Sequence, residues 1–320
     1  MDESFFFVTF AANNMYLDMW NKPWTMKEGF LIGGGLILIG LVLQLCVGPV
    51  AWAAIAWPVN AFVFGGLLAL ITVAFLLRKR IYAVRFLGTY MAAIPTLVYA
   101  VVLTIIMGLT RQDSDGVWLN DMLSFWPFVL IYVLMAVVIA LVILRRLMHL
   151  NCWRRDIPFL LNHVGLFLAM TTATLGNADM QRLKMVAAIG VPEWRAVAPN
   201  GAIQRMPLTI ELKRFIMETY DDGSPKRYAS EVSIRSVSGE TVHTTIDVNK
   251  PVEIEGWKIY QYGYDTAMGT MSQVSIFELV SDPWLPMVYA GIYMMLGGAV
   301  CMFVFGGRKS KAKGKEEVKD

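Results

Sequence analysis

The stretch FLLNHVGLFLAM, residues 159–170, is apolar enough for lipid, yet it carries a histidine at position 163. It belongs to a run, residues 159–175, that contains no Asp, Glu, Lys or Arg. A run of this kind approaches the ~20 residues that cross the hydrocarbon core of a bilayer. Backbone groups cannot stay unpaired in lipid, so the run should be helical. The stretch therefore predicts a transmembrane helix with an ionisable ring inside it.

Five other runs of the chain have the same character. They cover residues 30–47, 59–77, 86–109, 125–144 and 285–305. Hydrophobic residues make up 56% of the chain, whereas roughly 45–50% is usual in soluble domains. The sequence thus predicts a polytopic α-helical membrane protein with six transmembrane helices. Five of these fall in a membrane region, residues 29–176, and the sixth in residues 283–306.

Basic residues are distributed unevenly over the predicted loops. They concentrate in residues 78–85, 145–155 and the tail 307–320, whereas residues 111–121 set one arginine against three aspartates. The positive-inside rule therefore predicts cytoplasmic termini and an extracytoplasmic segment between helices five and six. Residues 1–28 lack the basic start of a signal peptide, so we expect an interfacial segment rather than a cleaved signal.

Residues 177–282 differ from the rest, because charged residues return and apolar residues alternate with polar ones. Such alternation is typical of half-buried strands. It is clearest in residues 208–215, 230–237, 241–248, 257–264 and 271–280. A small antiparallel β-rich domain between helices five and six is therefore predicted. Its histidine, His243, is interpreted as a solvated strand position, and no spacing indicates a catalytic residue.

Cysteine usage and nucleotide motifs exclude several functions. The chain has three cysteines, none of them in residues 177–282 and none in a C-x-x-C motif. It is therefore neither a thiol–disulfide carrier nor a c-type cytochrome. No G-x-x-x-x-G-K loop is present, so no direct use of ATP is expected. We expect the chain to interact with the lipid bilayer and not to bind nucleic acid.

His163 is the ionisable residue inside a predicted helix. Such a group costs about 2.5–3.5 kcal/mol on insertion scales, so it usually faces a bundle interior or a site. One interpretation is a hydrogen bond to another helix, through Asn162, Thr171 or Thr172. The other is an axial ligand to haem iron, for which neutral imidazole is common. His163 lies six residues after Ile157, or ~9 Å from the expected cytoplasmic boundary.

Trp153, Arg154 and Arg155 occupy that boundary and could contact the propionates of a haem. The positive-inside rule favours the other interpretation, in which they are basic anchors beside an interfacial tryptophan. His149 is interpreted as a residue that extends to the interface rather than as a ligand. A self-sufficient b-type site needs two facing histidines, and His163 has no second deep histidine to face. If His163 binds haem, the opposite ligand must come from a partner.

Three segments in order carry a family resemblance: NHVGLFLAMTTATLG (162–176), VNKPVEIEGWKIYQYGYD (248–265) and SDPWLPMVYAGIYMMLGGAVCMFVF (281–305). Residues 159–306 resemble the ResB (also CcsB) family of bacterial system II cytochrome c maturation. The lead-in MWNKPWTMKEGFLIG (19–33) is similar to short forms of this family in some anaerobic bacteria. The resemblance implies a location in the bacterial cytoplasmic (inner) membrane.

The resemblance also implies a haem-handling role. ResB-like proteins pair with a CcsA-like partner, also called ResC, and relay haem b to the C-x-x-C-H motif of an apocytochrome c outside. The helix histidine before the outer domain is the family's haem ligand, which corresponds to His163. The tryptophans here form no W-G-x-x-W platform, so the chain looks like the ResB half alone. It would then be a non-self-sufficient subunit of a cytochrome c synthase (haem lyase), with thioether formation largely on the partner.

Two other functions remain open at this point. The same histidine in an apolar bundle fits a membrane anchor of a quinol-oxidising respiratory complex. A non-catalytic membrane scaffold, in which His163 is only hydrogen-bonded and the β-rich domain docks a partner, is the third hypothesis.

Overall fold

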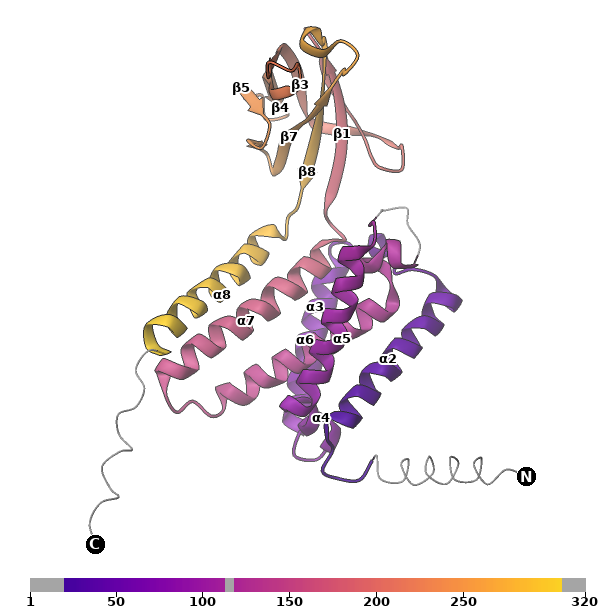
Figure 1. Ribbon diagram of the computed structural model, residues 1–320, viewed down its shortest axis with the longest axis vertical. Coiled ribbons are helices and arrows are strands. Elements are labelled where there is room, and N and C mark those ends of the chain that lie inside the picture. The colour runs from indigo at the N-terminus through magenta and orange to yellow at the C-terminus, as the bar shows by residue number, and fades with distance from the viewer. Residues whose placement is uncertain (1–19, 113–117, 307–320) are drawn as a thin grey trace. The chain divides into compact units, whose positions relative to one another are not determined.

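The computed structural model describes residues 20–112 and 118–306 (Figure 1). The chain divides into a helical unit, Met1–Ala178 with Trp284–Asp320, and a β unit, Asp179–Pro283. The predicted basic tail lies outside the described residues, and so does most of the predicted interfacial segment, residues 1–28.

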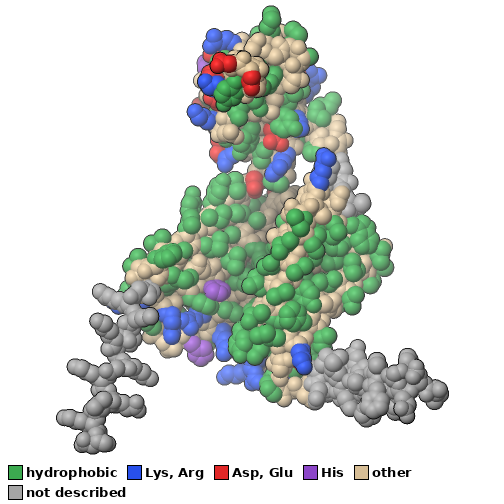
Figure 2. Space-filling model, viewed as in Figure 1, with side chains coloured by type: hydrophobic (Ala, Val, Ile, Leu, Met, Phe, Trp, Pro, Cys, Tyr) green, Lys and Arg blue, Asp and Glu red, His purple; other side chains and the backbone are tan. Residues whose placement is uncertain are grey.

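The helical unit contains six long helices that are apolar enough to cross a membrane. They are α2 (Met26–Val47), α3 (Val59–Leu77), α5 (Tyr90–Leu109), α6 (Trp126–Leu147), α7 (Trp153–Gly176) and α8 (Leu285–Gly306). This confirms the six predicted membrane helices. Figure 2 shows apolar side chains over their surface and Lys and Arg side chains gathered at one end of the unit. An apolar outer surface is what lipid requires, because lipid tails offer helices no polar partners.

The predicted helix over residues 86–109 is wrong at its start. A short helix, α4 (Tyr82–Leu87), ends at Gly88, and α5 begins only after Thr89, whose backbone is extended. A hydropathy run cannot reveal this break, because glycine and threonine are tolerated in apolar segments. The break leaves the carbonyl of Gly88 outside a helix, and Arg145 donates to it from Nη1 at 3.1 Å.

Glycines let α7 and α8 approach closely. A Cβ added to Gly291 would lie 2.6 Å from the carbonyl oxygen of Gly165 and 2.7 Å from the amide of Ala169. Both are backbone atoms, which cannot move without separating the helices. A Cβ on Gly297 of the same helix would meet nothing within 4 Å. The contact is thus of the small-residue type that brings membrane helices together.

We expect Gly291→Leu to destabilise the helical unit and Gly297→Leu to leave it unchanged. Overpacking typically costs ~1–3 kcal/mol, which lowers the unfolding midpoint by roughly 5 °C. Thermal unfolding of the two purified variants in the same detergent measures the difference. Equal midpoints would show that α8 is not held against α7 by this contact.

The β unit is one eight-stranded sheet in the order β5-β4-β3-β2-β1-β8-β7-β6, with antiparallel neighbours throughout. The strands are β1 (Gln181–Ala188), β2 (Pro192–Val197), β3 (Ile203–Thr219), β4 (Pro225–Ser236), β5 (Thr241–Asp247), β6 (Val252–Ile254), β7 (Trp257–Tyr264) and β8 (Val274–Ser281). The antiparallel β-rich prediction is confirmed. Alternate side chains form its core, with Met185, Ile210 and Phe277 fully buried.

Three strands were not predicted. In β1 buried and exposed residues alternate, but the inward positions include Met185 and Ala187, and neither is a β-branched or aromatic residue of the kind enriched in strands. β2 starts at a proline and has a register shift between Glu193 and Arg195, so its side chains do not alternate regularly. β6 has only three residues, which is too short for a periodic signal. His243 is exposed on β5, as expected of a solvated strand position.

Several ion pairs lie on the surface of the sheet. Arg195 hydrogen-bonds Glu193 through its guanidinium and backbone N–H, and these bonds lower the pKa of that carboxyl to about 2. Glu193 is therefore ionised at any physiological pH. Among the described residues, no three His, Cys, Asp or Glu side chains come together as a metal site.

Candidate functional site

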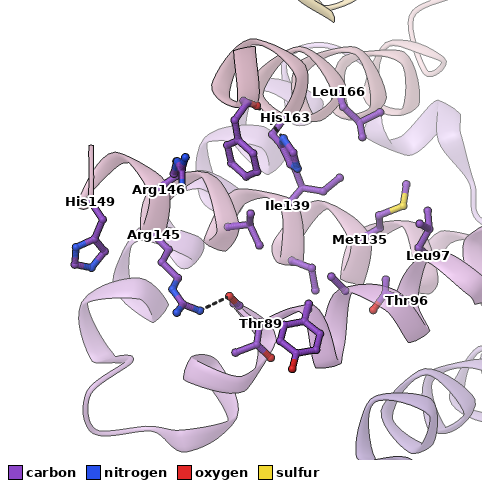
Figure 3. A pocket seen from close by; sticks show the side chains of 16 residues that line it. Thr89, Thr96, Leu97, Met135, Ile139, Arg145, Arg146, His149, His163 and Leu166 are labelled. Atoms are coloured by element: carbon purple, nitrogen blue, oxygen red, sulfur yellow. Dashed lines mark hydrogen bonds between the residues drawn. The ribbon is translucent and has the colours of Figure 1, made fainter. Parts of the chain in front are cut away.

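A cavity of about 630 Å³ opens between α5, α6 and α7 (Figure 3). Its size is within the roughly 300–1,000 Å³ typical of cofactor sites. Met135, Leu97 and neighbouring apolar side chains line one end, whereas Arg145 and His149 line the other. Ten residues of α6 separate Met135 from Arg145, so the ends lie ~15 Å apart along that helix. The cavity is therefore amphipathic along its length.

His163 lines this cavity from α7. Its Nδ1 lies 2.8 Å from the carbonyl oxygen of Phe159 in its own helix. A carbonyl oxygen can only accept, so Nδ1 carries the proton and a neutral ring keeps its lone pair on Nε2. Histidines that bind metals commonly donate their other N–H to a carbonyl or carboxylate in this way. The ring is thus in the tautomer that an iron ligand at Nε2 needs.

The hydrogen bond expected between His163 and another helix is not formed by the described residues. The candidate partners are satisfied within α7, since Thr171 donates to Phe167 O at 2.6 Å and Thr172 to Leu168 O at 2.7 Å. Asn162 donates to Pro158 O at 2.8 Å. None of these three side chains is bonded to Nε2 of His163, which therefore remains available to a ligand in the cavity.

Phe159 and Arg146 hold the imidazole in place. The rings of Phe159 and His163 stack with centroids 3.9 Å apart and planes 22° from parallel. The guanidinium carbon of Arg146 lies 5.1 Å from the Phe159 ring centroid, within cation–π range. The three side chains form a series that connects the end of α6 to the middle of α7.

Asp156 anchors this series at the start of α7. Its side chain is 2% exposed and pairs through Oδ1 with Arg146. Its Oδ2 accepts 2.8 Å hydrogen bonds from the backbone N–H groups of Asn151 and Cys152. An acidic side chain here satisfies helix-terminal donors and favours the positive end of the helix dipole. One carboxylate thus caps α7 and fixes Arg146 against Phe159.

The predicted propionate contacts lie elsewhere. Trp153, Arg154 and Arg155 are not among the residues that line the cavity. Trp153 packs edge-on against Phe305 with centroids 5.2 Å apart, and Arg154 lies over the Trp153 ring. The side chain of Arg155 is 67% exposed. The structure brings His163 to the cavity without these three residues.

Arg145 and His149 both line the cavity, although nothing in the sequence indicated a site at Arg145 and an interfacial position was favoured for His149. Both looked like ordinary members of a basic loop, because their spacing from His163 in sequence carries no signal. The break at Gly88 and the end of α6 bring them to the same cavity as His163. Arg145 uses Nη1 for the Gly88 carbonyl and retains further N–H donors for an anion.

The residues present fit a haem. The group is a flat apolar macrocycle with two carboxylates, and its iron binds a neutral imidazole. The cavity supplies an apolar end, a basic end and a histidine with a free Nε2 between them. Of the described histidines that line the cavity, His149 lies at the basic end, so His163 is the one that would offer an axial ligand between the two ends.

Residues 151–274 match the ResB-like family. Two curated relatives are cytochrome c biogenesis proteins CcsB of Prochlorococcus marinus, from strains NATL1A and NATL2A. Each is 29% identical over 112 residues, which is 35% of this chain and 25% of the relative. The chain therefore spans about a quarter of the length of these relatives.

A solved structure of a cytochrome c heme lyase, CcmF, gives a TM-score of 0.35 at 11% identity, over 88% of this chain and 46% of that one. A likeness this weak does not establish a shared fold. The family match and the CcsB relatives coincide with the expectation from the sequence. The resemblance to the ResB/CcsB family is thereby confirmed, and residues 151–274 of this chain form a ResB-like region.

Proposed function

We propose that this chain is the haem-handling membrane subunit of a system II cytochrome c maturation complex. In this role it holds haem b through His163 and relays it from the cytoplasmic side to an apocytochrome c outside. The observation that carries the proposal is the orientation of His163, whose Nδ1 is committed to Phe159 O while Nε2 remains free at an amphipathic cavity.

The polarity of the cavity supports entry from the cytoplasmic side. Its basic end, with Arg145 and His149, lies at the end of α6, beside loops rich in arginine and lysine. The positive-inside rule assigns such loops to the cytoplasm. Arginine binds carboxylates through paired N–H donors, so Arg145 would hold a haem carboxylate at that end. With this orientation, the β unit follows α7 on the outer side, where an apocytochrome c would be met.

The missing axial ligand supports a partner. The chain has three histidines; His149 lies at the basic end of the cavity and His243 lies in the β unit. A CcsA-like (ResC-like) membrane protein would supply the opposite ligand and the site of thioether formation. An anchor for a quinol-oxidising complex would instead need a facing histidine pair, so this alternative has less support. The bacterial inner membrane is the location that this function requires.

Reconstitution of maturation tests the proposal. We expect a bacterial host without its own maturation system to attach haem to a c-type cytochrome only when this chain and a CcsA-like partner are both expressed. Haem staining of the cytochrome on a denaturing gel is the readout, and immunoblotting confirms that the partner is present in each strain. Equal haem attachment with the partner alone would contradict the proposal.

A further inference from the structure

A second cavity, of about 410 Å³, lies where α3, α4 and α6 end. Arg78 and Lys79, which follow α3, and Arg85 of α4 line it together with Arg145 and His149. Among the residues that the structure describes, no acidic side chain lines it. Phe75, Val84 and Leu141 form its apolar wall.

The positive charges of this cavity have no acidic partner in the described part of the chain. Arg78, Lys79, Arg85 and Arg145 take part in none of its ion pairs. Nearby Arg146 differs, because Asp156 neutralises it. Four cations of one sign repel one another, so an anion in the cavity would relieve a real electrostatic cost.

Internal contacts hold two of these arginines in place. Arg78 donates Nη1 to Phe75 O at 2.7 Å and lies 3.8 Å from the centroid of the Phe75 ring. Arg85 lies 4.9 Å from the centroid of the Tyr82 ring. Each guanidinium has five N–H donors, and these interactions leave most of them available to a ligand. The donors are therefore ordered before any ligand arrives, which lowers the entropy lost on binding.

We propose that this basic cavity binds the phosphate headgroup of an anionic phospholipid. Basic pockets between transmembrane helices at the cytoplasmic side suit such headgroups. The mixed lining fits an amphipathic ligand, since Phe75, Val84 and Leu141 lie beside the cations. The surface of α3 next to this lining is apolar, with Leu76 69% exposed, and can accompany an acyl chain.

This cavity adjoins the one that His163 lines, and Gly88, Thr89, Arg145 and His149 border both. His163 itself lines only the first. The inference does not require that the chain binds haem. A headgroup in the second cavity would lie beside the basic end of the first and would help to place Arg145.

Lipid retention tests the site in the full chain. The protein is reconstituted in nanodiscs of phosphatidylcholine with phosphatidylglycerol, and retained lipids are counted by native mass spectrometry after release. We expect the double variant Arg78→Gln, Arg85→Gln to lose anionic lipid by roughly tenfold or more. Arg80→Gln is the matched control, because Arg80 lies in the same loop, is exposed and does not line the cavity. Equal retention in all three proteins would overturn the proposal.

Two further measurements cover a double variant that fails to fold and a site that binds free phosphate instead of lipid. Adding phosphatidylglycerol to phosphatidylcholine nanodiscs should raise the unfolding midpoint of the wild-type protein, because a ligand of the folded state stabilises it. No rise would overturn the proposal even if the double variant fails to fold. Inorganic phosphate at millimolar concentration should leave the lipid bound. If phosphate displaces the lipid and raises the midpoint by itself, the site takes a free anion and the lipid assignment is wrong.

Discussion

His163→Ala is expected to abolish the Soret band of this chain purified with the proposed CcsA-like partner. The substitution removes the imidazole whose free Nε2 lies between the two ends of the α5–α6–α7 cavity, whereas His149 lies at the basic end. Haem content should fall by roughly tenfold or more, because few other side chains replace an axial histidine. The measurement is the visible spectrum and the pyridine haemochrome content per complex, with assembly checked by size-exclusion chromatography.

His243→Ala provides the matched control, since His243 is exposed on β5 and is not among the residues that line this cavity. It should retain the full spectrum. Added imidazole should restore part of the Soret band to His163→Ala, because it can occupy the vacated space as a ligand. An unchanged spectrum in His163→Ala would remove this residue from the haem site. A colourless wild-type complex would leave His163 as a helix residue bonded only to Phe159.

The number of membrane helices was predictable because bilayer thickness requires apolar runs of about twenty residues, and such runs can be counted in the sequence. The predicted bounds of α3 agree with the structure at both ends. α7 begins six residues earlier than predicted, at Trp153, because a charged first turn with Asp156 does not register as an apolar run. His163 therefore lies ten residues, or ~15 Å, from the start of its helix. The distance of ~9 Å from the cytoplasmic boundary was counted from Ile157 and stays a prediction.

The cavity itself was not predictable from local patterns. It depends on the interruption at Gly88 and Thr89, which a hydropathy run conceals, and on which helices become neighbours. Residue type identified His163, because an ionisable ring in lipid is costly anywhere. Residue type could not distinguish Arg145 from Arg154, since both belong to basic loops. Their different roles follow from packing of α6 on α5 and α7.

Asp156→Asn is expected to weaken both the fold and the haem site. The amide can still accept a backbone N–H bond, but it carries no charge to pair with Arg146. Arg146 would then leave the Phe159 face, and the His163 ring would lose a fixed neighbour. We expect an unfolding midpoint lower by roughly 5 °C or more and a severalfold loss of bound haem. Thermal unfolding and haem titration of the complex measure the two effects separately.

Arg155→Gln is the control for charge alone, because Arg155 is exposed and lies 3.9 Å from the same carboxylate. Exposed pairs of this kind contribute little, so this variant should behave as wild type. Arg146→Gln and the double variant with Asp156→Asn complete a mutant cycle. If the carboxylate acts on His163 through Arg146 and Phe159, all three cycle variants lose haem to the same extent. If Asp156 only caps α7, Arg146→Gln keeps its haem, and the series from Asp156 to His163 does not position the ligand.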